Sequence, residues 1–288
     1  MQSECDIILI NPCGATGESV RRSLEAGGVR VKLIEGPNPR KFEDYYIKVL
    51  KKAVEKTGAR SIWPIFFPEH LAARRDEFPG VCIPLSDAGT IKLLDNKISS
   101  CALASKLGIL QPRIYAGPDE VDCYPMVFKR PDGQGGDSVY FPGSRKALDN
   151  LMKTASEVLL TEFIEGTNVC VDVLRWDGFF YGAAYKVLWP LRKGVSRLRE
   201  SIEAPELVET ARRILEHVDY KGVCGVDFRV DPQGRAYFLE CNPRFSGGIE
   251  SAIASGFDIP LLYYKLAAGE KPDPSGIIFR PGTVTGEE

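Results

Sequence analysis

The chain has 288 residues, of which 44% are hydrophobic and 26% are charged, and its formal net charge is −2. This composition is typical of a globular protein with a large core in two or three lobes, and it excludes fibrous, disordered and membrane-embedded classes. A charge so close to zero provides no basic surface for nucleic acid, so we expect no nucleic-acid partner.

The N-terminal sequence contains only a short apolar run, without a basic segment before it or a stretch of about 20 apolar residues. We therefore expect neither a signal peptide nor a membrane anchor, and a cytoplasmic location. Eight cysteines are scattered without any CxxC pair, which indicates reduced core thiols. Two histidines leave little material for a zinc site or a Ser-His-Asp triad.

The first elements predict a βαβ unit. Residues 6–11 are typical of a buried strand, a glycine turn and an amphipathic helix follow, and residues 29–34 give a second strand. A helix over 45–57, a strand over 60–65 and a helix over 70–78 complete an α/β lobe. The turn Gly14–Gly17 is either structural or a phosphate cradle, because it lacks the full G-x-G-x-x-G pattern and a P-loop lysine.

The next segment carries two lysines. A single helix is predicted from residue 88 to residue 107, and Lys97 within it is typical of an amphipathic surface. Residues 125–131 predict a strand that delivers Lys129 to the glycine-rich loop 132–138. Such a strand and loop suit a nucleotide phosphate, since glycines allow close backbone approach and the ammonium supplies charge. The alternative is an ordinary hairpin loop.

Strands dominate the middle of the chain. After a helix around 145–156, residues 157–164 predict a strand whose backbone can meet an adenine edge, and a hairpin turns at Asp177-Gly178. Residues 188–200 form an Arg- and Lys-rich loop, which is either solvated surface or a recognition surface for an anionic substrate. A helix over 205–218 follows.

The stretch from Tyr220 to Ile249 organises these signals. Two strand-like runs flank the reverse turn Asp231-Pro232-Gln233-Gly234, so antiparallel pairing can bring Asp227 close to Glu240. Adjacent carboxylates repel unless a cation lies between them, and a nearby amide and guanidinium suit Mg²⁺ with phosphate. The alternative is a solvated acidic hairpin.

The order of these motifs, ending in FLECNPRFSGG, resembles the ATP-grasp superfamily, in particular the branch of carbamoyl phosphate synthetase, biotin carboxylase and the pyrrolysine-pathway amino-acid ligase. The resemblance extends from the N-terminus to about residue 265. It implies an α/β chain, α+β in its ATP-binding part, with an ATP-grasp fold behind a parallel-sheet pre-ATP-grasp lobe. The implied bounds are 1–85 for that lobe, 86–165 for the small lobe with its linker helix, and 166–288 for the large lobe.

The same resemblance implies ATP and Mg²⁺ or Mn²⁺ as cofactors, and roles for individual residues. Metal ligands are Asp227, Glu240 and Asn242, while Arg244 and Lys129 serve catalysis. Nucleotide contacts come from both lysines, the mobile glycine loop and the adenine hinge: Lys97, Lys129, Gly133, Gly135, Gly136, Ser138, Glu162, Phe163 and Ile164. One position departs, because the family has an acidic residue gripping the ribose where this chain has Asn168, so we expect altered nucleotide binding.

The leading hypothesis is an ATP-dependent ligase that joins a small-molecule carboxylate to an amine through an acyl phosphate, with amino acids as the expected substrates. Bicarbonate activation is the first alternative, against which stands the absence of glutaminase, biotin-carrier or duplicated segments. A nucleotide-binding regulatory protein with degenerate catalysis is the second. Candidate substrate contacts are Arg197 and Arg199 for a carboxylate and Trp189 for an apolar pocket. Relatives of this kind are commonly dimers, so a homodimer is also expected.

Overall fold

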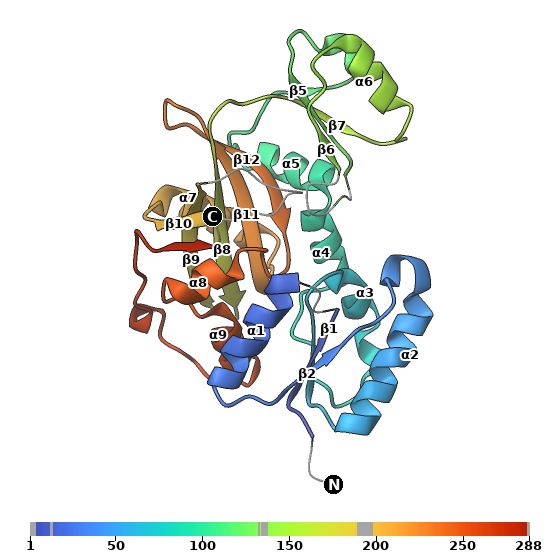
Figure 1. The fold of residues 1–288 in the computed structure, drawn as a ribbon, viewed down its shortest axis with the longest axis vertical. Coiled ribbons are helices and arrows are strands. Elements are labelled where there is room, and N and C mark those ends of the chain that lie inside the picture. The colour runs from blue at the N-terminus through green and yellow to red at the C-terminus, as the bar shows by residue number, and fades with distance from the viewer. Residues whose placement is uncertain (1–3, 12–13, 132, 134–137, 189–197, 287–288) are drawn as a thin grey trace.

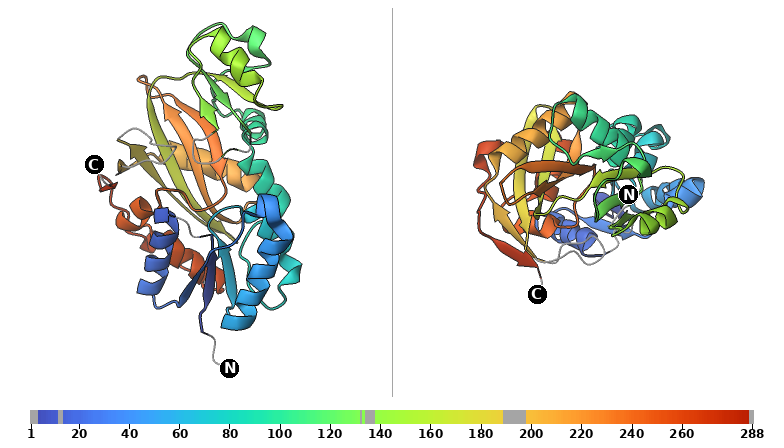
Figure 2. Two further views of the ribbon diagram at one scale, coloured as in Figure 1. Left: turned by 45° about the vertical axis from the view of Figure 1, so that its right-hand side comes forward. Right: turned by 90° about the horizontal axis from the view of Figure 1, so that it is seen from above.

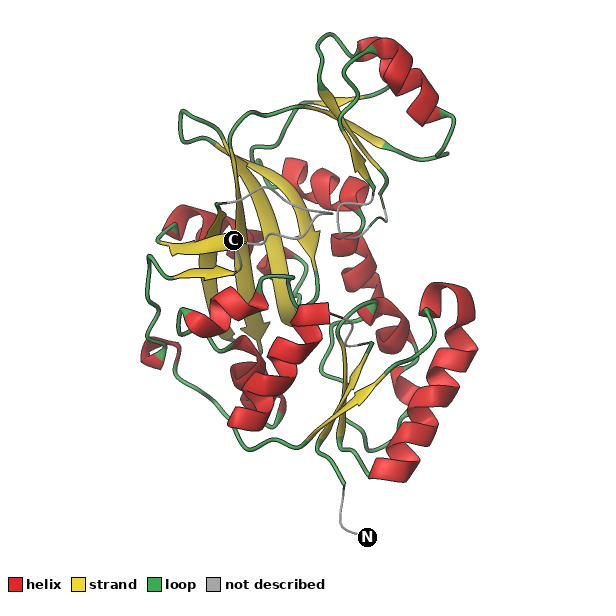
Figure 3. Cartoon of the chain, in the orientation of Figure 1, coloured by secondary structure: helices red, strands yellow, loops and turns green. Residues whose placement is uncertain are grey.

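Three sheets follow one another along the long axis of the molecule (Figure 1, Figure 3). The structure is a computed structural model, and it describes residues 4–11, 14–131, 133, 138–188 and 198–286. A three-stranded sheet lies beside the N-terminus, a six-stranded sheet forms the middle, and a four-stranded sheet lies at the far end. Within the described ranges, every helix is too short or too polar to cross a membrane.

The N-terminal lobe is the predicted βαβ unit. Its strands run parallel in the order β2-β1-β3, and every residue of β1 is buried. Helix α2 starts earlier than predicted because Asn38 caps it by accepting from the Arg40 N–H, with Pro39 in the first helical position. The elements are β1 (Ile7–Ile10), α1 (Gly14–Ala26), β2 (Val31–Ile34), α2 (Pro39–Thr57), β3 (Ser61–Pro64), α3 (Pro68–Ala73) and a 3₁₀ turn (Arg75–Glu77).

The single helix predicted over 88–107 is wrong, because the chain breaks it into α4 (Ala88–Asp95) and α5 (Lys97–Lys106). Asn96 between them has extended backbone angles, and its side chain accepts hydrogen bonds from the N–H groups of Ile98 and Ser99. Asn96 is thus an N-cap rather than an interior residue. Lys97 consequently opens a new helix instead of lying on the flank of a longer one.

The four-stranded antiparallel sheet has one face towards a small apolar core and the other towards a cavity, because successive side chains of a strand point to opposite faces. Met126 and Phe128 of β5 pack beneath α6 with Leu148, whereas Val127 and Lys129 point to the opposite side. Figure 2 shows this lobe as a cap at one end of the larger sheet. Its elements are β4 (Ile114–Tyr115), a 3₁₀ turn (Pro118–Glu120), β5 (Met126–Lys129), β6 (Val139–Tyr140), α6 (Arg145–Met152) and β7 (Leu159–Glu162), in the sheet order β4-β7-β5-β6.

The six-stranded sheet contains both predicted hairpins. The first turns at Asp177-Gly178 and the second at residues 231–235, as the sequence indicated. The end of the predicted loop 188–200 is instead the start of β10, and residues 189–197 lie outside the described ranges. The strands, in the order β12-β11-β8-β9-β10-β13, are β8 (Thr167–Trp176), β9 (Phe179–Val187), β10 (Leu198–Ile202), β11 (Gly222–Val230), β12 (Ala236–Asn242) and β13 (Val284–Gly286).

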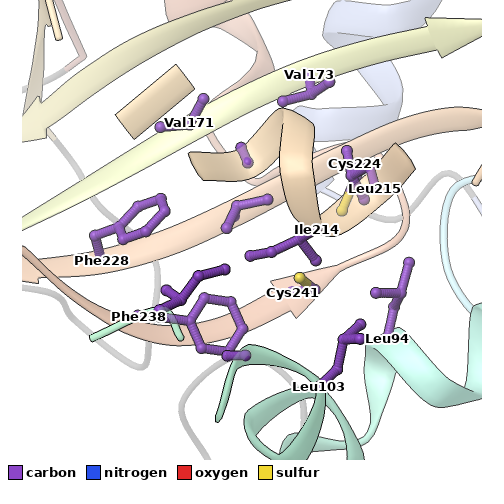
Figure 4. Close-up of a cluster of buried hydrophobic side chains, with 14 of the residues drawn as sticks. Leu94, Leu103, Val171, Val173, Ile214, Leu215, Cys224, Phe228, Phe238 and Cys241 are labelled. Atoms are coloured by element: carbon purple, nitrogen blue, oxygen red, sulfur yellow. The ribbon is translucent and has the colours of Figure 1, made fainter. Parts of the chain in front are cut away.

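Helices cover this sheet and attach it to the N-terminal lobe. α4, α5 and α7 pack on one face around a large apolar cluster that includes Val171, Ile214 and Phe228 (Figure 4). α8 and α9 lie against α1 (Figure 1), and Trp63 of β3 meets Phe245 and Tyr263 in the same cluster. The covering elements are α7 (Pro205–His217), α8 (Ile249–Ala254), α9 (Ile259–Ala267) and a 3₁₀ turn (Pro274–Gly276).

Candidate active site

A cavity of about 480 Å³ lies between the four-stranded sheet and the face of the six-stranded sheet that faces away from the large apolar cluster. Of the site residues predicted from sequence, eleven line it: Lys97, Lys129, Gly133, Ser138, Glu162, Phe163, Ile164, Asn168, Arg199, Asp227 and Glu240. Segments far apart in the chain therefore meet here, and the motifs found separately in the sequence belong to one site.

Two carboxylates form one wall of the cavity. Asp227 of β11 and Glu240 of β12 are direct cross-strand partners, and the ladder is interrupted by a bulge immediately after Asp227. The bulge leaves Leu239 as an extra residue in β12, so that Glu240 is aimed at the same side as Asp227. Burial and the charge of Glu240 raise the pKa of Asp227 to about 6. The pair thus has negative charge in excess, which a cation would relieve.

Two lysines face the carboxylates. Lys97 Nζ lies 3.2 Å from Glu240 Oε2 and donates to the Gly133 carbonyl at 2.8 Å. Lys129, at the end of β5, is almost fully buried, and burial lowers its pKa although Glu240 opposes this shift. Burial raises the pKa of Glu240, but Lys97 and Lys129 outweigh it and hold this pKa below its ordinary value.

Asn242 and Arg244 form a second layer behind the carboxylates. Asn242 Nδ2 donates to Asp227 Oδ2 at 3.0 Å and to Glu240 Oε1 at 3.4 Å, while its Oδ1 accepts from Arg244 Nη2 at 3.1 Å. The Arg244 guanidinium also lies 5.3 Å from the centre of the Phe66 ring, on the loop after β3. A half-turn of the Asn242 amide would direct its oxygen to a cation held by the two carboxylates.

Arg199 is a cation with unused donors. It is 9% exposed, and its Nε and Nη1 have no hydrogen-bond partner within the described part of the chain. Its guanidinium lies so close to Gly248 that a Cβ there would stand 1.9 Å from Nη1. Asp172 of β8 is buried in the same place, and burial raises its pKa although Arg199 opposes the shift. The sequence singled out Arg199 but missed Asp172.

The other end of the cavity is more open and aromatic. The rings of Phe141 and Phe163 meet edge to face with centroids 5.9 Å apart, and both line the cavity. Glu162 accepts from the Arg113 N–H through Oε1, which fixes the start of the predicted hinge. Residues 163 and 164 continue beyond β7 without strand pairing, so part of their backbone can meet a planar ligand.

Asn168 and Arg229 lie between these two ends. They are cross-strand partners in β8 and β11, and Arg229 Nη1 donates to Asn168 Oδ1 at 2.9 Å. Arg229 was not predicted as a site residue. The signal that identifies it is strand alternation, since it follows Asp227 by two positions and must share its face.

Four predicted residues, Gly135, Gly136, Trp189 and Arg197, lie outside the described residues. The Gly14–Gly17 turn does not line this cavity: Gly14 opens α1 in the N-terminal lobe, where Gly17 is buried. All seven described cysteines are free thiols, and five of them are buried as predicted for core thiols. Cys82 and Cys123 are exposed, so the prediction of a core position is wrong for these two.

The donor set fits a hard divalent cation that keeps part of its own hydration. Among the described residues, no group of three or more His, Cys, Asp or Glu side chains is placed to hold a metal. Two carboxylates and one amide suit Mg²⁺ or Mn²⁺, because Mg²⁺ is usually bound by one or two carboxylates together with water and substrate phosphates.

Comparison with known proteins gives one family match and several relatives. Residues 154–282 match the family described as "ATP-grasp in the biosynthetic pathway with Ter operon". A D-alanine--D-alanine ligase of Fusobacterium nucleatum is 20% identical over 153 residues, which cover 49% of this chain and 53% of that protein. The chain spans between about a third and a half of the curated relatives that it matches.

Solved structures match over nearly the whole chain. A biotin carboxylase from Campylobacter jejuni, solved as an ATP-analogue complex, gives a TM-score of 0.79 at 18% identity and covers 98% of this chain and 75% of that one. An L-amino acid ligase from Bacillus licheniformis gives 0.73 at 16% identity, covering 99% and 79%. At these identities the likeness concerns the fold.

Proposed function

The chain belongs to the ATP-grasp superfamily, as the sequence resemblance predicted, and from this premise we propose that it is an ATP-dependent carboxylate–amine ligase. It would join two small molecules, with amino acids as the expected substrates, and release ADP and phosphate. The observation that carries the proposal is the carboxylate pair Asp227 and Glu240 set against two buried lysines in one cavity. This arrangement suits the charge of a nucleotide triphosphate and its cation.

The proposed reaction overcomes a poor leaving group in two steps. A carboxylate oxygen of the substrate attacks the γ-phosphorus of ATP, the bond to the β,γ-bridging oxygen breaks, and ADP leaves. The amine nitrogen then attacks the acyl carbon, the C–O bond to phosphate breaks, and the nitrogen loses a proton. The protein needs no nucleophile of its own, which suits a site lined by cations and carboxylates.

The residues of the cavity and of the layer behind its carboxylates would divide this task by position. Lys97 and Lys129 would neutralise the phosphates during transfer. Arg244 lies behind the carboxylates and outside the lining, and it would be released to turn towards the transferred group once Asn242 gives its oxygen to the cation. Asp227 and Glu240, with Asn242, would hold Mg²⁺ or Mn²⁺, which when bound neutralises charge on the phosphate oxygens. Gly133 and Ser138, which line the cavity, would contribute close contacts to the phosphates.

Arg199 is the best-supported candidate for holding the substrate carboxylate. Arg199 lines the same cavity as Asp227, and a buried cation with unpartnered donors favours an anionic ligand. The buried Asp172 would offset part of its charge. Arg197 and Trp189 stay predictions for the same substrate. A cytoplasmic homodimer also stays a prediction, which light scattering and cell fractionation check.

The test is phosphate release from Mg-ATP across a panel of amino acids, offered singly and in pairs, with bicarbonate as a separate arm. We expect release that requires two amino acids, accompanied by a product whose mass equals their sum less one water. Release with bicarbonate alone would replace the proposal with carboxyphosphate formation. Silence throughout with intact ATP binding would support the regulatory alternative instead.

A matched pair of variants links the result to the carboxylates. Glu240→Gln keeps the shape of the side chain but removes its charge, so we expect ADP formation to be abolished while the circular dichroism spectrum is kept. Glu200→Gln is the control, because Glu200 lies in β10 and does not line the cavity. Turnover retained by Glu240→Gln would contradict the metal-binding role.

A further inference from the structure

The middle of the cavity can be assigned to a part of the nucleotide from the parts proposed for its two ends. On the inner face of β8, Asn168 lies next to the hinge, and Cys170, two residues on, is the cross-strand partner of Asp227. If the base meets the hinge and the phosphates meet the lysines, the sugar that joins them falls at Asn168 and Arg229. This assignment rests on the proposed function.

Arg229 already occupies two hydrogen-bond acceptors at this position, the Ile164 carbonyl and the Asn168 side-chain oxygen. Arg229 Nε donates to the Ile164 carbonyl at 3.0 Å, and Arg229 Nη1 donates to Asn168 Oδ1 at 2.9 Å. The same guanidinium lies 5.9 Å from the centre of the Phe163 ring. The arginine therefore ties the hinge, its aromatic ring and the start of β8 into one unit.

What is left for a ligand is a set of donors. In the part of the chain that the structure describes, Arg229 Nη2 and Asn168 Nδ2 have no hydrogen-bond partner, and both residues line the cavity. Glu162, also in the lining, is turned to the Arg113 N–H, and the exposed Glu165 acts on Arg229 from outside the lining. A ribose that meets a carboxylate donates its hydroxyl protons, whereas here it meets a cation and an amide N–H.

We propose that Arg229 is a specificity-determining residue that holds Asn168 by its oxygen and makes the sugar end of the site an acceptor-reading, positively charged subsite. Such a subsite recognises the lone pairs of the ribose oxygens and tolerates a phosphate group on the 2′ or 3′ position. The physical reason is the one by which dinucleotide sites differ: an acidic residue accepts from a free ribose hydroxyl, and an arginine accommodates a sugar phosphate.

The experiment measures displacement of a fluorescent ADP analogue from the full chain with Mg²⁺ by AMP, adenosine 2′,5′-bisphosphate and adenosine 3′,5′-bisphosphate. For the unaltered protein we expect at least one bisphosphate to bind as tightly as AMP or more tightly. In Arg229→Leu we expect that bisphosphate to weaken at least about tenfold relative to AMP, since one charge-assisted hydrogen bond is removed. The ratio isolates the sugar contact from any general loss of stability.

Two further variants make the outcome decisive. Arg235→Leu removes an arginine from the same hairpin, which is paired with Asp231 outside the cavity, and should leave the ratio unchanged. Asn168→Asp restores a carboxylate and should disfavour the bisphosphate even if Arg229→Leu does not fold. If the unaltered protein rejects both bisphosphates at least tenfold, or no variant shifts the ratio, the assignment to Arg229 fails while the proposed function stands. If no adenine nucleotide binds at all, both fail.

Discussion

The two faces of the six-stranded sheet are made by the same strands, but one face is apolar and the other carries charged side chains. On the outer face, Val226 and Phe228 of β11 lie in an apolar cluster under α4, α5 and α7 (Figure 4). On the inner face, Asp227 and Arg229 of the same strand line the cavity. Adjacent residues therefore face an apolar core and a charged cavity, separated only by the direction of each side chain.

The fold buries charged side chains at the cavity face of the sheet, where their desolvation is unfavourable. Lys97, Lys129 and Arg199 are each at least nine-tenths buried, although burying a charge is unfavourable unless it is paired. Their partners across the cavity are carboxylates whose own pairing is incomplete. A site that holds these charges in place before ligand arrives needs little reorganisation during the reaction, which is the basis of electrostatic preorganisation.

The largest effect is expected from the inner face. Asp227→Asn removes one of the two carboxylates that we propose hold the metal, so kcat/KM for ATP-dependent turnover should fall on the order of 10³-fold or more. The same change removes repulsion with Glu240, so the melting temperature should stay the same or rise. Phosphate release and thermal unfolding, measured on one preparation, check the predicted fall in activity and the predicted unchanged or higher melting temperature. Activity within tenfold of the unaltered protein would contradict the functional reading of this face.

The neighbouring residue should give the reverse result. Phe228 is 1% exposed and its ring centre lies 6.2 Å from that of Phe238, so Phe228→Ala should lower the free energy of unfolding by about 3 kcal/mol through lost packing and a cavity. ATP affinity of the folded protein should change less than threefold. Denaturant titration and calorimetry measure these quantities.

The control for that variant is Phe42→Ala. Phe42 is 59% exposed on α2, so the same substitution should cost less than about 0.5 kcal/mol. A loss of nucleotide affinity in Phe228→Ala as large as its loss of stability would mean that the two faces are not separable.

The sequence predicted the structure correctly where a local pattern is compatible with a single structural element. The turn at 231–234 and the alternation on both sides of it predicted the β11–β12 hairpin and placed Asp227 opposite Glu240. It failed at Asn96, because apolar spacing continues through the break and the capping role of an asparagine appears only when its neighbours are extended. The domain bounds stay a prediction.

The parts of the site that escaped prediction depend on cross-strand pairing. Asp172 and Arg229 carry no motif, and each becomes meaningful only through a residue on another strand, Arg199 for the first and Asn168 for the second. Register between β8 and β11 could not be read from composition, since loops of unknown geometry separate them. The bulge at Asp227 was equally hidden, although it sets the aim of Glu240.

The smallest effect comes from a carboxylate that contrasts with Asp227. Asp6, at the start of β1, accepts from Arg30 Nε and Nη2 at 3.1 and 3.0 Å and from Arg60 Nη2 at 3.0 Å, and these arginines lower its pKa from 3.8 to about 2. Because the folded pKa lies below the unfolded one, the stabilisation is present above pH 4 and is lost as the pH falls towards 2. Both arginines are largely exposed, so we expect about 1 kcal/mol after screening.

Asp6→Asn tests this sign. The difference in free energy of unfolding between the unaltered protein and Asp6→Asn should be about 1 kcal/mol at pH 6 and shrink towards zero at pH 2, and added salt should reduce it. Asp44→Asn, at a 93% exposed position, should show a smaller difference throughout. A difference that grows on acidification would mean that Asp6, like Asp227, is a carboxylate whose charge the fold opposes, and the contrast between a structural ion pair and a functional one would be lost.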